Sequence, residues 1–210
     1  MDRFIRFGLV AGVVGGALLA LGSGISVVTA GGHALSVQAT TSAFVLGSAL
    51  RLLGAVGMLL GLGGLVARCA ERGGALLMTA YALAVAGLAL NLGWIWSDLF
   101  VSDTIAGVAP AVLDGIDHAG TRLDAGALGA WIANVSFVLL AVAVARTRSV
   151  PRASWIALAV AGAVTLVPLP FDGLVYEVLI GVGFAVATAL AMATPPSRAV
   201  VGTPAGARVA

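Results

Sequence analysis

The sequence has little charge. Only 10% of its 210 residues are charged, whereas a soluble globular domain carries about one quarter, because charged side chains must cover its surface. Hydrophobic residues make up 60% of the chain, and the mean hydropathy is +1.11. This composition excludes an ordinary soluble domain and predicts a membrane protein with the lipid bilayer as its main surroundings.

Lysine is absent, and all eleven basic side chains are arginine. Together with 29 glycines and abundant alanine and valine, this usage is typical of a bacterial genome rich in G and C. The isoelectric point of about 9.3 could indicate a nucleic-acid partner. The arginines are scattered between apolar segments, however, with no basic cluster interleaved with aromatic residues. We therefore predict no nucleic-acid binding.

Cysteine is nearly absent. The single residue, Cys69, excludes an internal disulfide framework, and we interpret it as a reduced thiol without a role. The chain also lacks a complete catalytic, nucleotide-binding or metal motif, and no nucleophile and base stand together, which argues against an enzyme. Since His33 and His118 both fall outside the apolar runs, they could not hold a haem within a bilayer. We expect no cofactor.

Long apolar runs are what the sequence has in abundance. A bilayer core about 30 Å thick needs about 20 apolar residues per spanning helix. Six such runs occur, at residues 7–30, 43–67, 74–97, 125–145, 153–171 and 174–194. The first resembles a signal peptide in outline, but its apolar part is too long for one, so we interpret it as a retained anchor. The fold class predicted is all-α, a polytopic bundle of six transmembrane helices.

The arginines between these runs indicate the orientation. Nine arginines fall in connections on one side of the membrane, and only Arg122 falls on the other. The nine are Arg3, Arg6, Arg68, Arg72, Arg146, Arg148, Arg152, Arg198 and Arg208. Since arginine is enriched in cytoplasmic loops, we predict a multi-pass protein of the bacterial cytoplasmic membrane with both termini cytoplasmic. Residues 1–194 would form one membrane domain, followed by a short disordered tail over residues 195–210.

The longest connection, residues 98–124, lies on the outer side in this scheme. Ile105, Val108, Val112 and Ile116 recur at helical spacing, which predicts a short amphipathic helix on the membrane surface. Pro110 should kink or split it, because proline removes a helical hydrogen bond. Asp114, Asp117 and His118 stand about one turn apart and are weak candidates for a divalent metal ion; solvated charges on a surface helix are the favoured interpretation.

Two charges lie inside the runs, Arg51 in the second and Glu177 in the sixth. A central arginine costs about 2.5 to 3.5 kcal/mol on insertion, and the leucines of its helix cover the opposite face. Arg51 should therefore point into the bundle. We predict that it pairs with Glu177, with Asp98 as the competing carboxylate. Asn91 and Asn134 also lie on small-residue faces in the outer half, and complete the predicted polar cluster.

The cluster permits two interpretations. The favoured one is a buried ion pair in a structural or partner-binding membrane subunit, whose partner is a second copy or another membrane protein. The alternative is a small-solute carrier or ligand-binding membrane protein, with an outward-facing site for a small polar or anionic ligand around Arg51. Gly8, Gly12 and Gly16, and Gly57 with Gly61, follow the G-x-x-x-G spacing and should mediate helix packing within the chain.

The pattern GLGGLVARCAERGGALLMTAYALAVAGLAL, followed by APAVLDG and RTRSVPRASWIALAVAGA, resembles a group of uncharacterised multi-pass integral membrane proteins of actinobacteria. The resemblance covers about Gly47 to Ala193. It implies a polytopic helical fold and carries no activity, substrate, cofactor or site residue.

Overall fold

The computed structural model describes residues 3–30, 33–118, 121–164 and 173–194. These residues form helices and short connections, with no strand among them. The elements are α1 (Arg3–Ala30), α2 (Leu35–Ala39), α3 (Ser42–Ser97), the π-helix η1 (Asp98–Ser102), α4 (Asp103–Val108), α5 (Pro110–His118), α6 (Thr121–Thr147), α7 (Arg152–Val164) and α8 (Gly173–Ala193). The predicted all-α class is confirmed for the described part of the chain.

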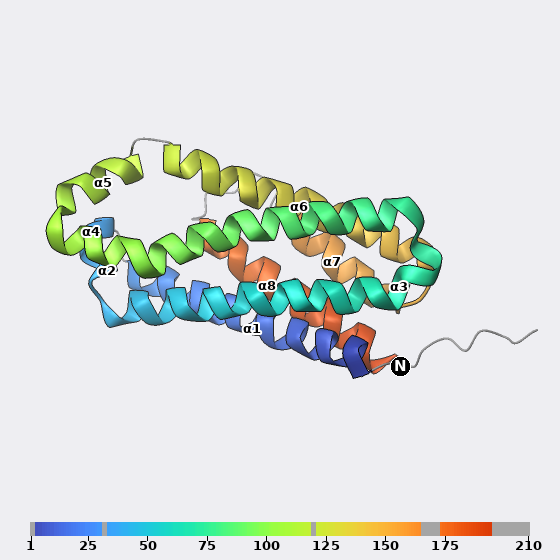
Figure 1. The fold of residues 1–210 in the computed structure, drawn as a ribbon. Coiled ribbons are helices and arrows are strands. Elements are labelled where there is room, and N and C mark those ends of the chain that lie inside the picture. Colours follow the sequence, from blue (N-terminus) through green and yellow to red (C-terminus); the bar gives the residue numbers. More distant parts are fainter. Residues whose placement is uncertain (1–2, 31–32, 119–120, 165–172, 195–210) are drawn as a thin grey trace, which may run out of the picture.

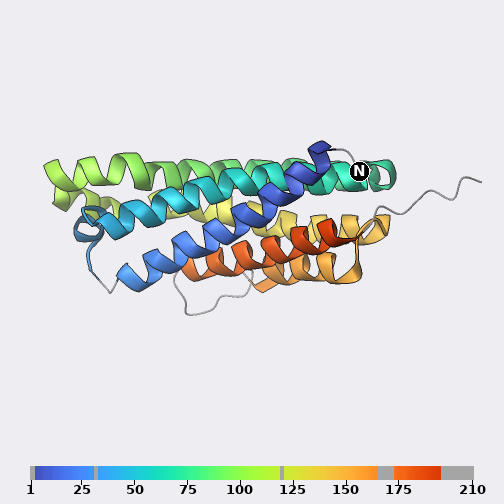
Figure 2. The same cartoon turned by 90° about the horizontal axis from the view of Figure 1, so that it is seen from below.

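The long helices lie side by side along one axis (Figures 1 and 2). Four helical segments in the described ranges are long and apolar enough to cross a membrane: Arg3–Thr29, Ser42–Val108, Leu128–Thr147 and Leu174–Ala193. This arrangement is compatible with a helical membrane protein. The predicted fifth run is described only over residues 153–164, which belong to α7, and the rest of that run and the predicted tail lie outside the described residues.

Helix α3 contains two of the predicted runs, because the chain reverses within it. Gly74 has φ 57° and ψ −163°, outside the helical range, and Figure 1 shows the helix doubling back at this end of the bundle. A positive φ is accessible to glycine because it has no Cβ. The first arm, residues 42–73, and the return arm, residues 75–97, correspond to the second and third predicted runs.

Glycines bring α1 into close contact with its neighbours. A Cβ added to Gly12 would lie 3.0 Å from the Cα of Gly61, and one added to Gly57 would lie 2.7 Å from the Cα of Gly15. On the α8 side, a Cβ on Gly16 would meet the carbonyl oxygen of Gly181. Such backbone proximity is possible only without side chains in the interface. The predicted packing role of these glycines within the chain is confirmed.

The main core lies between the long helices. Phe137 of α6 and Phe184 of α8 meet there with their ring centroids 5.8 Å apart, and both are fully buried. Leu53, Val56 and Leu60, on the side of α3 opposite Arg51, are exposed. The helix therefore presents its arginine inward and its leucines outward, as predicted.

The end of the bundle remote from Gly74 carries a small cap made by α2, α4 and α5 (Figure 1). Phe44 packs there against Ala106 and Leu113. The predicted amphipathic helix is split: Ala109 leaves the helical range at φ −146° and ψ 65°, and Pro110 begins α5. Proline suits a first helical position because no hydrogen bond from its nitrogen is needed there.

The apolar spacing in this cap identified the packed residues only in part. Ile105 of the predicted stripe packs against the core of the cap. Val108, however, is 83% exposed and Val112 is also exposed, and the buried Ala106 and Leu113 lie off the stripe. The side chain of Ile116 is not among those that the structure describes. Contact of Val108 and Val112 with a membrane surface stays a prediction.

Candidate functional site: a buried arginine between two carboxylates

Arg51 lies on the first arm of α3 and binds two carboxylates. Its Nε and Nη2 donate to Oε2 and Oε1 of Glu177 at 2.7 and 3.0 Å, and its Nη1 donates to Oδ2 of Asp98 at 3.3 Å. The contact with Glu177 is bidentate, the geometry in which a guanidinium binds a carboxylate most strongly. The predicted Arg51–Glu177 pair is therefore present, and Asp98, predicted as its competitor, joins it instead.

Four elements place these groups together. Glu177 comes from α8, Asp98 begins η1, and Ser23 of α1 donates from Oγ to Oε2 of Glu177 at 2.7 Å. We call Arg51, Asp98, Glu177 and Ser23 the arginine cluster. It connects α1, α3, η1 and α8, so that helices distant in sequence share one set of polar contacts.

Close backbone approach makes room for the arginine. Gly22 of α1 lies against it, and a Cβ there would fall 2.8 Å from the backbone nitrogen of Arg51 and 2.9 Å from its Cγ. The arginine stem therefore lies directly against the α1 backbone. Arg51 is only 2% exposed, and its charge must be satisfied by protein groups.

Asp98 stands where the α-helix of the return arm changes to a π-helix. Residues 98–102 form η1, and Asp98 itself is buried. A π-turn widens the helix by about one residue per turn and often occurs at functional positions. Here it begins at the residue whose carboxylate binds Arg51.

The cluster has an excess of negative charge. One guanidinium faces two carboxylates, and each nitrogen of Arg51 already has a carboxylate oxygen as its partner. An anionic ligand approaching Arg51 would meet both carboxylates, and like charges at short range repel strongly in a low dielectric. The geometry therefore argues against an anionic ligand at Arg51, whereas the alternative of a small polar ligand stays a prediction.

Ser23 and Glu177 form a hydroxyl–carboxylate contact, but the pair is poorly suited to catalysis. A nucleophilic serine needs a neighbouring base that can accept its proton. The carboxylate of Glu177 already accepts hydrogen bonds from two N–H groups of Arg51. The contact therefore positions the serine without activating it.

The two predicted asparagines do not join the cluster: neither makes a hydrogen bond to it within the described residues. Asn134 is buried in α6, where its Oδ1 lacks a hydrogen-bond partner, and its backbone oxygen faces Gly162 of α7. Asn91 is half-buried on the return arm of α3 beside Gly129 of α6.

The candidate metal residues lie in the cap. Both carboxylate oxygens of Asp114 accept hydrogen bonds from Ser36, one from its backbone N–H and one from its hydroxyl. Asp114 thus connects α5 to the start of α2. Asp117 and His118 lie on α5, but their side chains are not among those that the structure describes. Within the part of the chain that the structure describes, no three carboxylate, histidine or cysteine side chains form a metal-binding group.

Sequence reasoning missed Ser23. Serine is common in apolar helices, where its hydroxyl usually bonds to the backbone of its own helix, as Ser26 does with the carbonyl of Gly22. Only the position of α8 shows that Ser23 binds Glu177. A comparison of the chain with known protein families, curated proteins and solved structures gave no match.

Proposed function

We propose that this chain is a structural or partner-binding subunit of the bacterial cytoplasmic membrane, spanning it six times with both termini in the cytoplasm. The cluster would then hold the bundle together and bind no ligand. Its partner would be a second copy of the chain or another membrane protein.

The ends of the bundle support this orientation. The start of α1, the turn at Gly74 and the α6–α7 connection lie together at one end, and the cap formed by α2, α4 and α5 lies at the other (Figure 1). Arg3, Arg6 and Arg146 belong to the first end, and Asp103 and Asp114 to the cap. This is the charge distribution expected if the first end is cytoplasmic.

The observation that carries the proposal is that two carboxylates of the same chain bind the guanidinium of Arg51. A binding arginine in a carrier needs donors that are free to meet a solute, or a path by which the solute can reach them. Every nitrogen of this guanidinium instead binds a carboxylate of the same chain, and the residue is 2% exposed. Paired charges of this kind support packing.

Cysteine labelling distinguishes the packed cluster from an open site. In a Cys69→Ser background, Ser23→Cys places a thiol of similar size inside the cluster, and Val108→Cys places one on the exposed cap. Intact cells are treated with a membrane-impermeant thiol reagent. We expect Val108→Cys to react quickly and Ser23→Cys to react only after denaturation in sodium dodecyl sulfate.

The outcomes separate the two parts of the proposal. Reaction of Ser23→Cys in intact cells at a rate near that of Val108→Cys would show an open path to the cluster, and would favour the solute-binding alternative. If Val108→Cys reacts only after the cells are lysed, the proposed orientation is wrong.

A further inference from the structure

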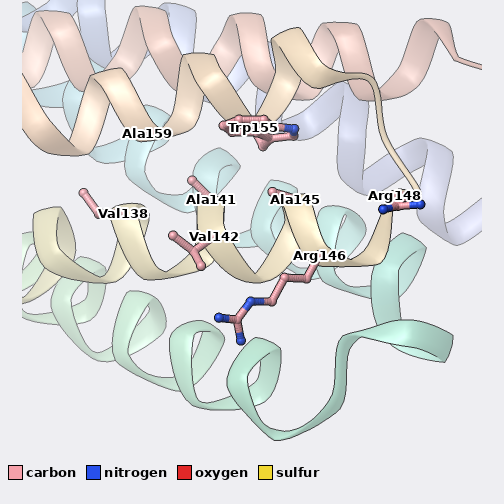
Figure 3. A pocket seen from close by; sticks show the side chains of 8 residues that line it. All are labelled: Val138, Ala141, Val142, Ala145, Arg146, Arg148, Trp155 and Ala159. Atoms are coloured by element: carbon pink, nitrogen blue, oxygen red, sulfur yellow. The ribbon is translucent and has the colours of Figure 1, made fainter.

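An open groove runs between α6 and α7 near the α6–α7 connection. It has a volume of about 460 Å³ and is lined by Val138, Ala141, Val142, Ala145, Arg146, Arg148, Trp155 and Ala159. Figure 3 shows these side chains: alanines and valines along the two helices, Trp155 projecting from α7, Arg148 at the turn, and Arg146 projecting from the side of α6 away from α7. The groove therefore has an apolar lining, and its basic end is at the turn, where Arg148 lies.

Arg146 and Arg148 have no internal partner among the described residues, which is also true of the exposed Arg3, Arg6 and Arg72. Within the described residues, the side chains of Arg146 and Arg148 make no hydrogen bond or ion pair, and both are exposed. Arg68, at the same end of the bundle, instead donates to the carbonyl oxygens of Ser149 and Thr194. Arg148 also has a left-handed φ of 53°, a conformation that often ends a helix.

From this groove we infer a binding site for one anionic phospholipid of the cytoplasmic leaflet. The inference rests on the membrane insertion contained in the proposed function, but not on the structural role of the arginine cluster. The phosphate would lie at the turn beside Arg148, with the exposed side chain of Arg146 as a second cation near the same end, and part of an acyl chain would lie along Val138, Ala141 and Val142. Basic pockets between transmembrane helices on the cytoplasmic side bind anionic headgroups in this manner.

The dimensions fit this occupant. From Val138 to Arg146 the groove follows α6 for about 12 Å, at about 1.5 Å per residue. One leaflet of the hydrocarbon core is about 15 Å thick, half of a core of about 30 Å. The apolar lining thus follows most of one leaflet before the arginines begin. Trp155 lies near the basic end, where aromatic side chains sit at headgroup level.

Charge selects an anionic lipid over a zwitterionic one. Each arginine near an anionic surface strengthens binding by about fivefold, so two give roughly 25-fold. A soluble anion such as phosphate would use the arginines but leave the apolar lining without a partner. The alanine and valine lining therefore favours a lipid.

Quenching of Trp155 fluorescence by brominated lipids tests the inference. A full-length variant with Trp94→Phe, Trp96→Phe and Trp131→Phe retains Trp155 alone, and a second variant retains only the exposed Trp131 of α6. Each is reconstituted into vesicles of phosphatidylcholine and phosphatidylglycerol in which one or the other lipid is brominated. We expect Trp155 to be quenched by brominated phosphatidylglycerol with a preference of roughly 10- to 25-fold, and Trp131 with little preference.

Substitutions then assign the preference to the groove. Arg146→Gln with Arg148→Gln should reduce the preference at Trp155 to about onefold, whereas Arg3→Gln with Arg6→Gln, which changes two exposed arginines of the same end outside the groove, should leave it unchanged. Circular dichroism of each variant reports whether it has folded. Equal quenching by both lipids in the variant that retains Trp155, or its loss on adding inorganic phosphate, would overturn the inference.

Failure of the proposed function itself has a different signature. If the chain did not insert into the bilayer, neither brominated lipid would quench Trp131, whose exposed ring on α6 should face the lipid. Quenching of Trp131 by both lipids without selectivity at Trp155 would leave membrane insertion intact and reject the lipid site alone.

Discussion

Removing members of the arginine cluster one at a time should destabilise the protein in a defined order. Arg51→Leu leaves the carboxylates of Asp98 and Glu177 without the guanidinium that binds both, and we expect a loss of about 3 to 5 kcal/mol in the free energy of unfolding. Glu177→Leu removes two of the three contacts but leaves Arg51 paired with Asp98, so about 2 to 3 kcal/mol is expected. Asp98→Leu removes the longer contact with Arg51, at 3.3 Å, and should cost about 1 to 2 kcal/mol.

The triple substitution is the decisive variant. With Arg51, Asp98 and Glu177 all replaced by leucine, no buried charge is left uncompensated, and a buried ion cluster exchanged for apolar side chains often costs little. We expect the triple variant to lose less than half of the summed loss in free energy of unfolding of the three single variants. The double variant Arg51→Leu with Glu177→Leu should be less stable than the triple one, because Asp98 remains buried in it without the guanidinium of Arg51.

Unfolding is followed by circular dichroism in mixed micelles as sodium dodecyl sulfate is added, which gives the free energy of unfolding for each variant. Couplings among residues in contact are about 0.5 to 3 kcal/mol. If the summed losses of the single variants equal the loss of the multiple variant to within about 0.5 kcal/mol, the contacts are energetically independent of one another. A larger loss from Asp98→Leu than from Glu177→Leu would refute the assignment of the bidentate pair as the stronger contact.

Two further substitutions test the packing. Gly57→Val should lower the free energy of unfolding in the same assay by about 1 to 3 kcal/mol, because its Cβ would lie 2.7 Å from the Cα of Gly15. Gly93→Val, at a position with open space around it, is the matched control. An equal effect of the two substitutions would count against the glycine contact between α1 and α3. Arg68→Leu should lower the free energy of unfolding by about 1 to 2 kcal/mol, because it removes the contacts with the carbonyls of Ser149 and Thr194. Arg72→Leu, at an exposed position, should change it by less than about 0.5 kcal/mol. Similar losses for both variants would contradict a specific role for Arg68.

Much of the local structure could be predicted from the sequence because its causes are local. The length of an apolar run indicates a helix that can cross a bilayer. A proline such as Pro110 interrupts a helix through its own covalent geometry, and the small-residue face of α3 shows on which side Arg51 must lie. The pairing of Arg51 with Glu177 followed from scarcity: these are the two charges within the apolar runs, and a charge removed from water needs a partner.

The composition of the cluster depended on tertiary structure. Asp98 reaches Arg51 from the π-turn that begins η1, and helical spacing on the return arm of α3 does not predict that turn. Ser23 became a partner of Glu177 only through the contact of α1 with α8. Asn134 satisfies every sequence criterion for the cluster, yet it lies on α6 against α7.

The same distinction applies to the α6–α7 end. The sequence by itself determined that arginines would gather there, since their number between apolar runs is a property of the chain. Which of them remain available was decided by the fold, because Arg68 reaches the carbonyls of Ser149 and Thr194, while Arg146 and Arg148 border an open groove. Periodicity and composition describe each helix separately, whereas hydrogen-bond partners and grooves arise where helices distant in sequence meet.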